Sequence, residues 1–218
     1  ALLLSLGAIP ALATTVKGVG DNPLTITSGL VTSRVISTAT KTDPLPPSQV
    51  LNTPVVQIRE PNSSGISHNI YSQFDVSATG LMLNNAVTAT EAVLGAESTD
   101  SGQIQFVIGA NPQLSAGAAS VILNEVVSAN ASTLAGAIEV VGDQADGTPA
   151  DVIIANPYGI TCTGCSTLNT GLTALVTGSA TVSGSNIAFD LSSAALTIAN
   201  NGKSDAQLDA DKLALVSR

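Results

Sequence analysis

The chain is poor in charged and aromatic side chains. Only 11% of its 218 residues are charged and 2% are aromatic, with no tryptophan, whereas ordinary domains carry roughly 25% charged residues. No Lys or Arg occurs between residues 61 and 202. Because binding to phosphates needs a basic patch, nucleic acid is excluded as an expected partner, and an anionic membrane surface is disfavoured for the same reason. The net charge of −9 suits the solubility of an extracellular protein.

Histidine and cysteine are also scarce. His68 is the single histidine, and Cys162 and Cys165 are the only cysteines. A structural zinc site takes four ligands, usually Cys or His, so we expect no metal site and no cofactor. His68 is interpreted as a packed or turn-bonding residue rather than a catalytic base. For the Cys-x-x-Cys pair a disulfide clasp, a redox-active pair and two free thiols are all open, and an exported chain favours the clasp.

The N-terminal residues indicate export. Residues 1–13 form the apolar run ALLLSLGAIPALA, whose Ala-Leu-Ala ending is typical of the cleavage site of a secretory signal peptide. A membrane-spanning helix needs about 20 apolar residues, so this run is too short to span a bilayer. We therefore predict a signal-peptide remnant at 1–13 and a mature domain at 14–218. The membrane is expected to be crossed during export without stable insertion.

Short apolar runs bounded by turn-forming residues make up the rest of the chain. Such runs, rich in Val, Ile, Leu and Thr, are typical of β-strands, and no window of a dozen residues keeps a convincing helical period. The runs begin at residues 55, 80, 104, 120, 136, 151, 173, 186, 195 and 212. The sequence therefore predicts an all-β domain, with exposed loops at 41–49 and 143–149. Asp143, Asp146 and Asp151 are interpreted as solvated, with weak calcium binding as the alternative.

Two turn phrases favour a solenoid over a sandwich or a barrel. ANPQL at 110–114 and ANPYGI at 155–160 lie about 45 residues apart, which fits two coils of roughly 22 residues each. Small side chains and Asn suit the tight turns between strands that stack like on like. The predicted fold is a right-handed parallel β-helix.

Several phrases occur in an order that is specific to one family. They are ISHNIYSQFDV, GLMLNN, ANPQL, ILNEVVSAN and VIIANPYGITCTGC. With them the chain resembles, from about residue 22 to 218, the N-terminal two-partner secretion domain of large bacterial exoproteins: filamentous haemagglutinins, haemolysins and contact-dependent growth-inhibition toxins. The resemblance implies a right-handed parallel β-helix with capping N-terminal strands and no enzymatic activity. It also implies that a dedicated outer-membrane β-barrel transporter recognises the domain through periplasmic POTRA domains and delivers the chain to the cell surface or medium.

The family's NPNL and NPNGI motifs are each matched with one change. The first corresponds to Asn111, Pro112, Gln113 and Leu114, and the second to Asn156, Pro157, Tyr158, Gly159 and Ile160. Gln113 and Tyr158 stand where the family usually has Asn. In both phrases Pro fixes φ at a turn, and the preceding Asn can hydrogen-bond the backbone two residues on. These residues are the predicted transporter-recognition turns, and Cys162 and Cys165 the predicted disulfide beside the second.

An enzyme of the same fold is the alternative function. Many β-helix proteins act on polysaccharides as lyases or hydrolases, and a lyase site needs an acidic cluster with a basic residue beside it. The long stretch without Lys or Arg and the lack of aromatic platforms for sugar rings argue against that interpretation. The sequence therefore favours a secretion domain over a polysaccharide-active enzyme.

Overall fold

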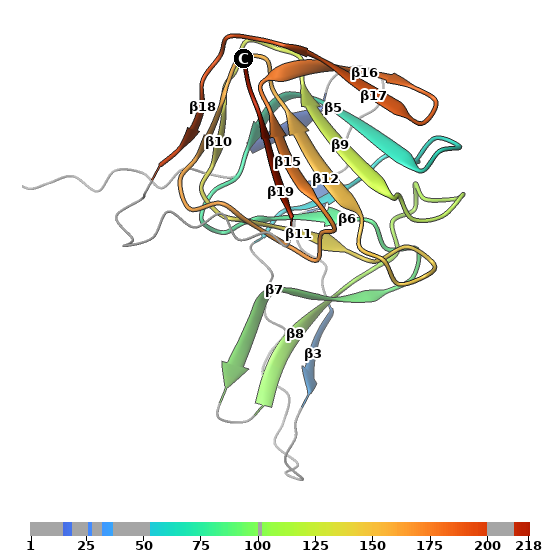
Figure 1. Cartoon of the computed structure of the whole chain (residues 1–218). Helices are drawn as coiled ribbons and strands as arrows, with labels where there is room; N and C mark the ends of the chain where they lie inside the picture. The colour runs from blue at the N-terminus through green and yellow to red at the C-terminus, as the bar shows by residue number, and fades with distance from the viewer. Residues whose placement is uncertain (1–14, 19–25, 28–31, 37–52, 100–101, 200–211) are drawn as a thin grey trace, which may run out of the picture.

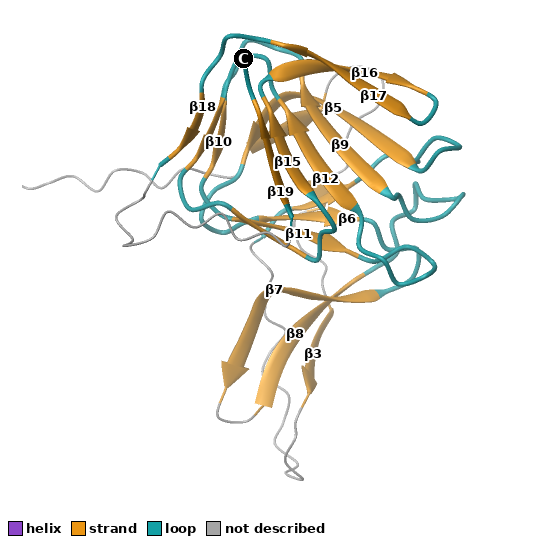
Figure 2. Ribbon diagram, viewed as in Figure 1, coloured by secondary structure: helices purple, strands orange, loops and turns teal. Residues whose placement is uncertain are grey.

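The computed structural model describes residues 15–18, 26–27, 32–36, 53–99, 102–199 and 212–218. The predicted signal-peptide remnant and the loop at 41–49 lie outside these residues. Every regular element in the described ranges is a β-strand, and none of these ranges holds a helix that is long and apolar enough to cross a membrane. The all-β prediction is confirmed (Figure 2).

Three sheets of parallel strands wind around a common interior (Figure 1). The long sheet contains β5 (Ile66–Asp75), β9 (Val121–Val126), β12 (Asp151–Ala155), β15 (Thr173–Val176) and β19 (Leu213–Val216). The short sheet contains β10 (Ser132–Leu134), β13 (Ile160–Cys162) and β18 (Leu196–Ile198). The middle sheet contains β4 (Val55–Gln57), β6 (Leu81–Asn84), β11 (Ala137–Val141) and β14 (Ser166–Leu168). The chain visits the long, short and middle sheets in turn, as a parallel β-helix does, so the predicted fold is confirmed.

The N-terminal strands cover one end of this solenoid. β1 (Thr15–Gly18) pairs antiparallel with β5, and β2 (Ile26–Thr27) pairs antiparallel with β4. Val16 of β1 is buried in the interior cluster. These strands therefore cap the first coil, as the family resemblance implies.

The interior of the solenoid is mainly aliphatic, with a few buried polar groups. Tyr71 and Phe74 of β5 meet edge to face with ring centroids 4.9 Å apart, a favourable geometry for aromatic pairs. The Tyr71 hydroxyl donates to Asn124 Oδ1 at 2.9 Å, and burial raises the pKa of Tyr71 above its usual value. The Tyr71 hydroxyl is thus satisfied inside the core, as buried polar groups usually are.

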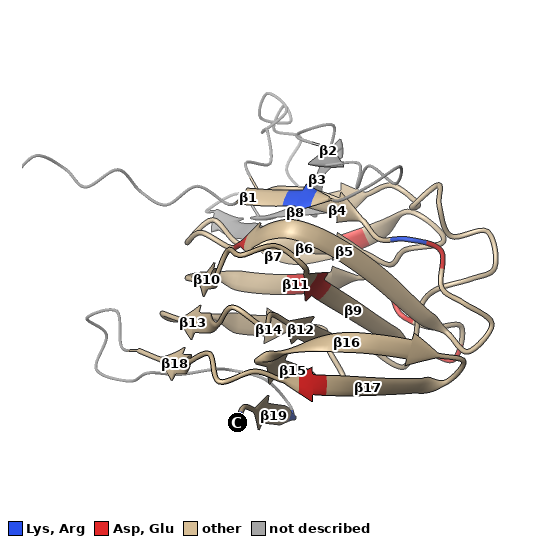
Figure 3. Cartoon of the chain, turned by 90° about the horizontal axis from the view of Figure 1, so that it is seen from above, with Lys and Arg blue, Asp and Glu red and all other residues tan. Residues whose placement is uncertain are grey.

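Two β-structures are inserted between the coils. β7 (Thr90–Thr99) and β8 (Gly102–Ile108) form an antiparallel sheet with β3 (Thr32–Ile36), which projects from the solenoid (Figure 1). β16 (Gly178–Ser183) and β17 (Asn186–Leu191) form a hairpin over the outer face of the long sheet. Figure 3 shows Asp and Glu scattered singly over the elements seen in that view.

The two Asn-Pro turns do not recur at one corner of a regular repeat, although their 45-residue spacing fits two coils of roughly 22 residues. Asn111 binds the carbonyl of Asn84 in the middle sheet and precedes β9, whereas Asn156 follows β12 and leads into β13 of the short sheet. The turns therefore lie at different corners. The inserted strands lengthen two of the coils, so Ile66 pairs with Val121 but Val152 with Thr173, and no constant repeat length exists.

All ten apolar runs coincide with strands, but the runs do not mark every strand. The strands outside the runs are β1, β2, β3, β5, β7, β10, β13, β14 and β16. Of these, the family resemblance implied only the capping strands at the N-terminus. Strand pairing uses backbone groups, so a polar stretch becomes a strand when a neighbouring coil offers partners.

Candidate recognition turns

Asn156 is fully buried at the corner between the long and short sheets. Its Oδ1 accepts the N–H of Tyr158 at 2.8 Å, which closes the local turn. Its Nδ2 donates to the carbonyl of Asn130 and to Ser132 Oγ, both at 2.9 Å. One side chain therefore shapes its own turn and fixes it to the preceding coil.

The rest of this motif divides into buried and exposed positions. Ile160 is 1% exposed and belongs to the interior cluster, whereas Tyr158 is 47% exposed. Gly159 has a φ of 113°, a backbone conformation that residues other than glycine rarely adopt. The motif thus presents one aromatic side chain outward from a turn held by its buried neighbours.

Asn111 makes the same kind of bonds at its own corner. It is 3% exposed, and its Oδ1 accepts the N–H of Gln113 at 3.0 Å. Its Nδ2 donates to the carbonyls of Ile58 and Asn84, both at 2.8 Å. Leu114 is buried in the interior cluster, and Pro112 is exposed. Both Asn-Pro turns therefore use the bond expected from sequence and add bonds to distant segments.

Sequence reasoning gave no role to two neighbouring asparagines that support the first turn. Asn84 Oδ1 accepts the N–H of Ala86, and Asn84 Nδ2 donates to Gln57 Oε1 and to the carbonyl of Gly109. Asn85 binds both the N–H and the carbonyl of Ala119 through its side chain. The Asn-Asn pair in GLMLNN at the end of an apolar run was the available signal.

Glu60 holds the segment that follows Leu114. Its carboxylate accepts the N–H of Ser115 at 2.7 Å and that of Ala116 at 2.6 Å, and also the Ser115 hydroxyl. These donors, led by the Ser115 amide, hold the pKa of the Glu60 carboxyl below its usual value of 4.5. Ionised Glu60 therefore stabilises the chain just after the first Asn-Pro turn.

The Glu60 contact predicts a pH response. Because its folded pKa is depressed, its stabilisation is present above the unfolded pKa and is lost as the pH falls through the folded pKa. NMR titration should give a Glu60 carboxyl midpoint below 4.5, with the Ser115 and Ala116 amide shifts following that midpoint. Glu60→Gln should abolish the amide response. A midpoint at or above the usual value would contradict the assignment.

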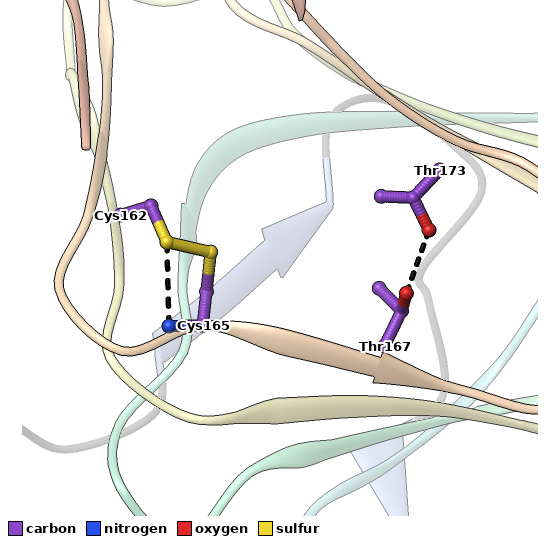
Figure 4. The surroundings of a disulfide bond; sticks show 4 residues. All are labelled: Cys162, Cys165, Thr167 and Thr173. Carbon is purple, nitrogen blue, oxygen red and sulfur yellow. Dashed lines mark hydrogen bonds between the residues drawn. A yellow bond between two sulfur atoms is a disulfide. The ribbon is translucent and has the colours of Figure 1, made fainter. Parts of the chain in front are cut away.

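Cys162 and Cys165 form a disulfide at the corner between the short and middle sheets (Figure 4). Their Cα atoms are 5.4 Å apart, and the residues are 0% and 2% exposed. The N–H of Cys165 points to Cys162 Sγ at 3.3 Å. Nearby, Thr167 Oγ1 and Thr173 Oγ1 are 2.7 Å apart. The pair is enclosed by the coil, which suits a clasp better than an accessible redox site.

We predict that this disulfide is present in the exported protein. Alkylation in denaturant without reductant should leave the intact mass unchanged, and prior reduction should allow two additions. Replacing both cysteines with Ser should leave the domain folded, because so short a loop contributes only about 2 kcal/mol of chain entropy. Two alkylated thiols before reduction would refute the clasp.

The other candidate residues do not gather into a site. His68 Nε2 lies 2.8 Å from Glu125 Oε2. Asp146 accepts hydrogen bonds from Thr148, and Asp143 accepts one from the side chain of Asn169. Among the residues that the structure describes, no three His, Cys, Asp or Glu side chains are placed to hold a metal ion. The loop at 143–149 is largely exposed, as predicted.

Comparison with known proteins identifies the family. Residues 37–218 match the TPS secretion domain. The tRNA nuclease CdiA of Yersinia mollaretii is 42% identical over 76% of this chain, and the filamentous hemagglutinin of Bordetella pertussis is 40% identical over 68%. The hemolysin of Proteus mirabilis is 42% identical over 58% of the chain. The chain covers only 5%, 4% and 7% of those three proteins, respectively.

A solved structure agrees with the sequence matches. The crystal structure of a filamentous hemagglutinin secretion domain superposes with a TM-score of 0.54 at 35% identity, covering 79% of this chain and 48% of the other. The chain belongs to the TPS secretion domain family. It is therefore a secretion domain, of the kind found in exoproteins that reach the cell surface or the medium by two-partner secretion.

Proposed function

We propose that the domain is the export address of a longer exoprotein and is recognised by a dedicated outer-membrane β-barrel transporter. The match of residues 37–218 to a secretion domain carries the proposal. Recognition through periplasmic POTRA domains of that transporter is the finer part of the proposal. The passenger is an adhesin, a haemolysin or a toxin, because the relatives bear names of these three kinds.

We assign transporter recognition to the two Asn-Pro turns, which comprise Asn111, Pro112, Gln113 and Leu114, and Asn156, Pro157, Tyr158, Gly159 and Ile160. Their support is the shared construction: a buried Asn, an adjacent Pro that is exposed or half-buried, and side-chain bonds to distant backbone. The bonds to distant backbone can form only when the neighbouring coil is in place. A transporter that binds the chain while it is still extended would contact the Asn-Pro sequence before these hydrogen bonds form.

The proposal is non-enzymatic, and family membership favours it over a polysaccharide-active enzyme. The test is expression of the chain behind a functional signal peptide, with and without its cognate transporter. We expect the protein in the medium or on the cell surface only when the transporter is present, and in the periplasm otherwise. Equal export without the transporter would refute the proposal.

A further inference from the structure

Two glutamates are buried on the outer faces of the solenoid. Glu125 of β9 is 4% exposed and Glu139 of β11 is 1% exposed. The strands that carry or cover them contain no Lys or Arg; they are β5, β7, β9, β11 and β16. A buried carboxylate is costly unless hydrogen bonds replace its water. The donors that these two carboxylates have found are therefore informative.

Glu139 binds the inserted strand β7. It faces away from the interior, because its neighbours Ile138 and Val140 belong to the interior cluster. Its two oxygens accept one N–H each, from Val93 and from Leu94, both at 2.6 Å. Burial raises the pKa of the Glu139 carboxyl, and these two donors act in the opposite direction.

The two donors of β7 lie where that strand departs from β8. The register between β7 and β8 shifts between Ala92 and Glu97, so Val93 and Leu94 fall within an irregularity of the pairing. Backbone groups at such a bulge lose their ladder partners. Glu139 supplies the acceptors there, and the adjacent apolar side chains, which include Met82, Ala92 and Val141, are buried against one another.

Glu125 makes a corresponding contact to the β16–β17 hairpin. Its Oε1 accepts the N–H of Ala180 at 2.7 Å, and its Oε2 pairs with His68 Nε2 at 2.8 Å. The hairpin tip has a second attachment, because Asn62 Nδ2 donates to the carbonyl of Gly184 at 3.1 Å. Between these points the hairpin packs on an apolar strip of the long sheet that includes Leu123, Ala155, Ala174 and Val176.

We propose that Glu125 and Glu139 are fastening residues, each of which positions one inserted β-structure on an outer face of the solenoid. Each does so by accepting backbone N–H groups of the insertion. Release of either contact would expose an apolar strip of a sheet to water. This role concerns the folded domain and does not depend on the proposed export function.

The proposal predicts different effects on the two contacts when each glutamate is replaced with glutamine. In Glu125→Gln the amide oxygen can still accept the Ala180 N–H, and the new NH₂ group can hydrogen-bond His68 Nε2 when that nitrogen is the acceptor. In Glu139→Gln a single oxygen faces two N–H donors, and the NH₂ group opposes one of them. Fastening should therefore survive the first substitution and weaken in the second.

Amide hydrogen exchange on the 218-residue chain, compared between variants at one fixed pH, tests this. Glu125→Ala should speed exchange at Ala180, and Glu139→Ala at Val93 and Leu94, by roughly 10- to 100-fold, the worth of a hydrogen bond to a charged group. Glu125→Gln should match the wild type, and Glu139→Gln should speed at least one of its two amides. Asp190→Asn, which removes an exposed carboxylate from β17, is the matched control and should change none of them.

Three results would overturn the proposal. One is unchanged exchange at Ala180 in Glu125→Ala, or at Val93 and Leu94 in Glu139→Ala. Another is an equal rise throughout β12 and β15, which would indicate global destabilisation. The third is slower exchange of these amides in both Gln variants than in the wild type. That result would show that the two buried carboxylates destabilise the contacts rather than stabilise them. If the Ala variants do not fold, the two Gln variants still test the proposal. Equal changes in amide exchange in Glu125→Gln and Glu139→Gln would contradict it.

Discussion

Replacing Asn156 with Ala is expected to remove most of the exported protein from the medium while the purified domain still folds. The substitution deletes the acceptor for the Tyr158 N–H and the donor to Asn130 and Ser132. Leaving such buried groups unpaired costs about 1–3 kcal/mol, which a domain with on the order of 10 kcal/mol of stability survives. Export should be the more sensitive readout, because the turn is proposed as the recognition element. Asn111→Ala should behave similarly but less severely.

The measurement compares protein in the medium with protein retained in the periplasm after co-expression with the cognate transporter. Circular dichroism on the purified variants verifies folding. Tyr158→Asn, which restores the usual family residue, should be neutral or favourable, and Asn186→Ala at the exposed start of β17 should be neutral. Wild-type export by both turn variants would move recognition elsewhere in the domain.

Gly142→Ala is expected to destabilise the domain by about 3 kcal/mol or more, because it combines a backbone clash with a strained φ. Gly142 has a φ of +98°, and a Cβ there would lie 2.5 Å from Ala86 Cα and 2.7 Å from its nitrogen. Ala86 also offers its carbonyl to the Asn111 N–H at 2.7 Å. The clash should therefore reach the first Asn-Pro turn as well as the stacking of two coils.

Gly147→Ala is the matched control for the clash. Gly147 has a φ of +79°, but a Cβ added there would have nothing within 4 Å, so only backbone strain of about 1 kcal/mol applies. Urea unfolding of both variants separates the two effects. Equal urea midpoints for the two variants would show that the segment around Ala86 shifts to accommodate a side chain at residue 142, and would contradict the predicted clash.

The sequence alone determined the features that depend on neighbouring residues. Apolar runs bounded by turn formers located ten strands, because burial of Val, Ile and Leu in short segments requires no knowledge of the partner. Asn followed by Pro likewise determined the local bonds from Asn111 to Gln113 and from Asn156 to Tyr158. The low content of charged and aromatic residues determined that the core and sheet faces would be built largely from small and aliphatic residues.

Only the tertiary structure decided which distant segments meet. The strand β5 is polar enough to escape a hydrophobic pattern, yet its Tyr71 and Phe74 are buried in the core, where Asn124 of β9 accepts the Tyr71 hydroxyl. Nothing in the sequence distinguishes Glu125 and Glu139 from solvated residues, because the insertions that cover them lie 55 and 46 residues away in sequence, at Ala180 and Val93. Coil lengths, corner positions and these carboxylate contacts depend on long-range packing, for which local propensity carries no information.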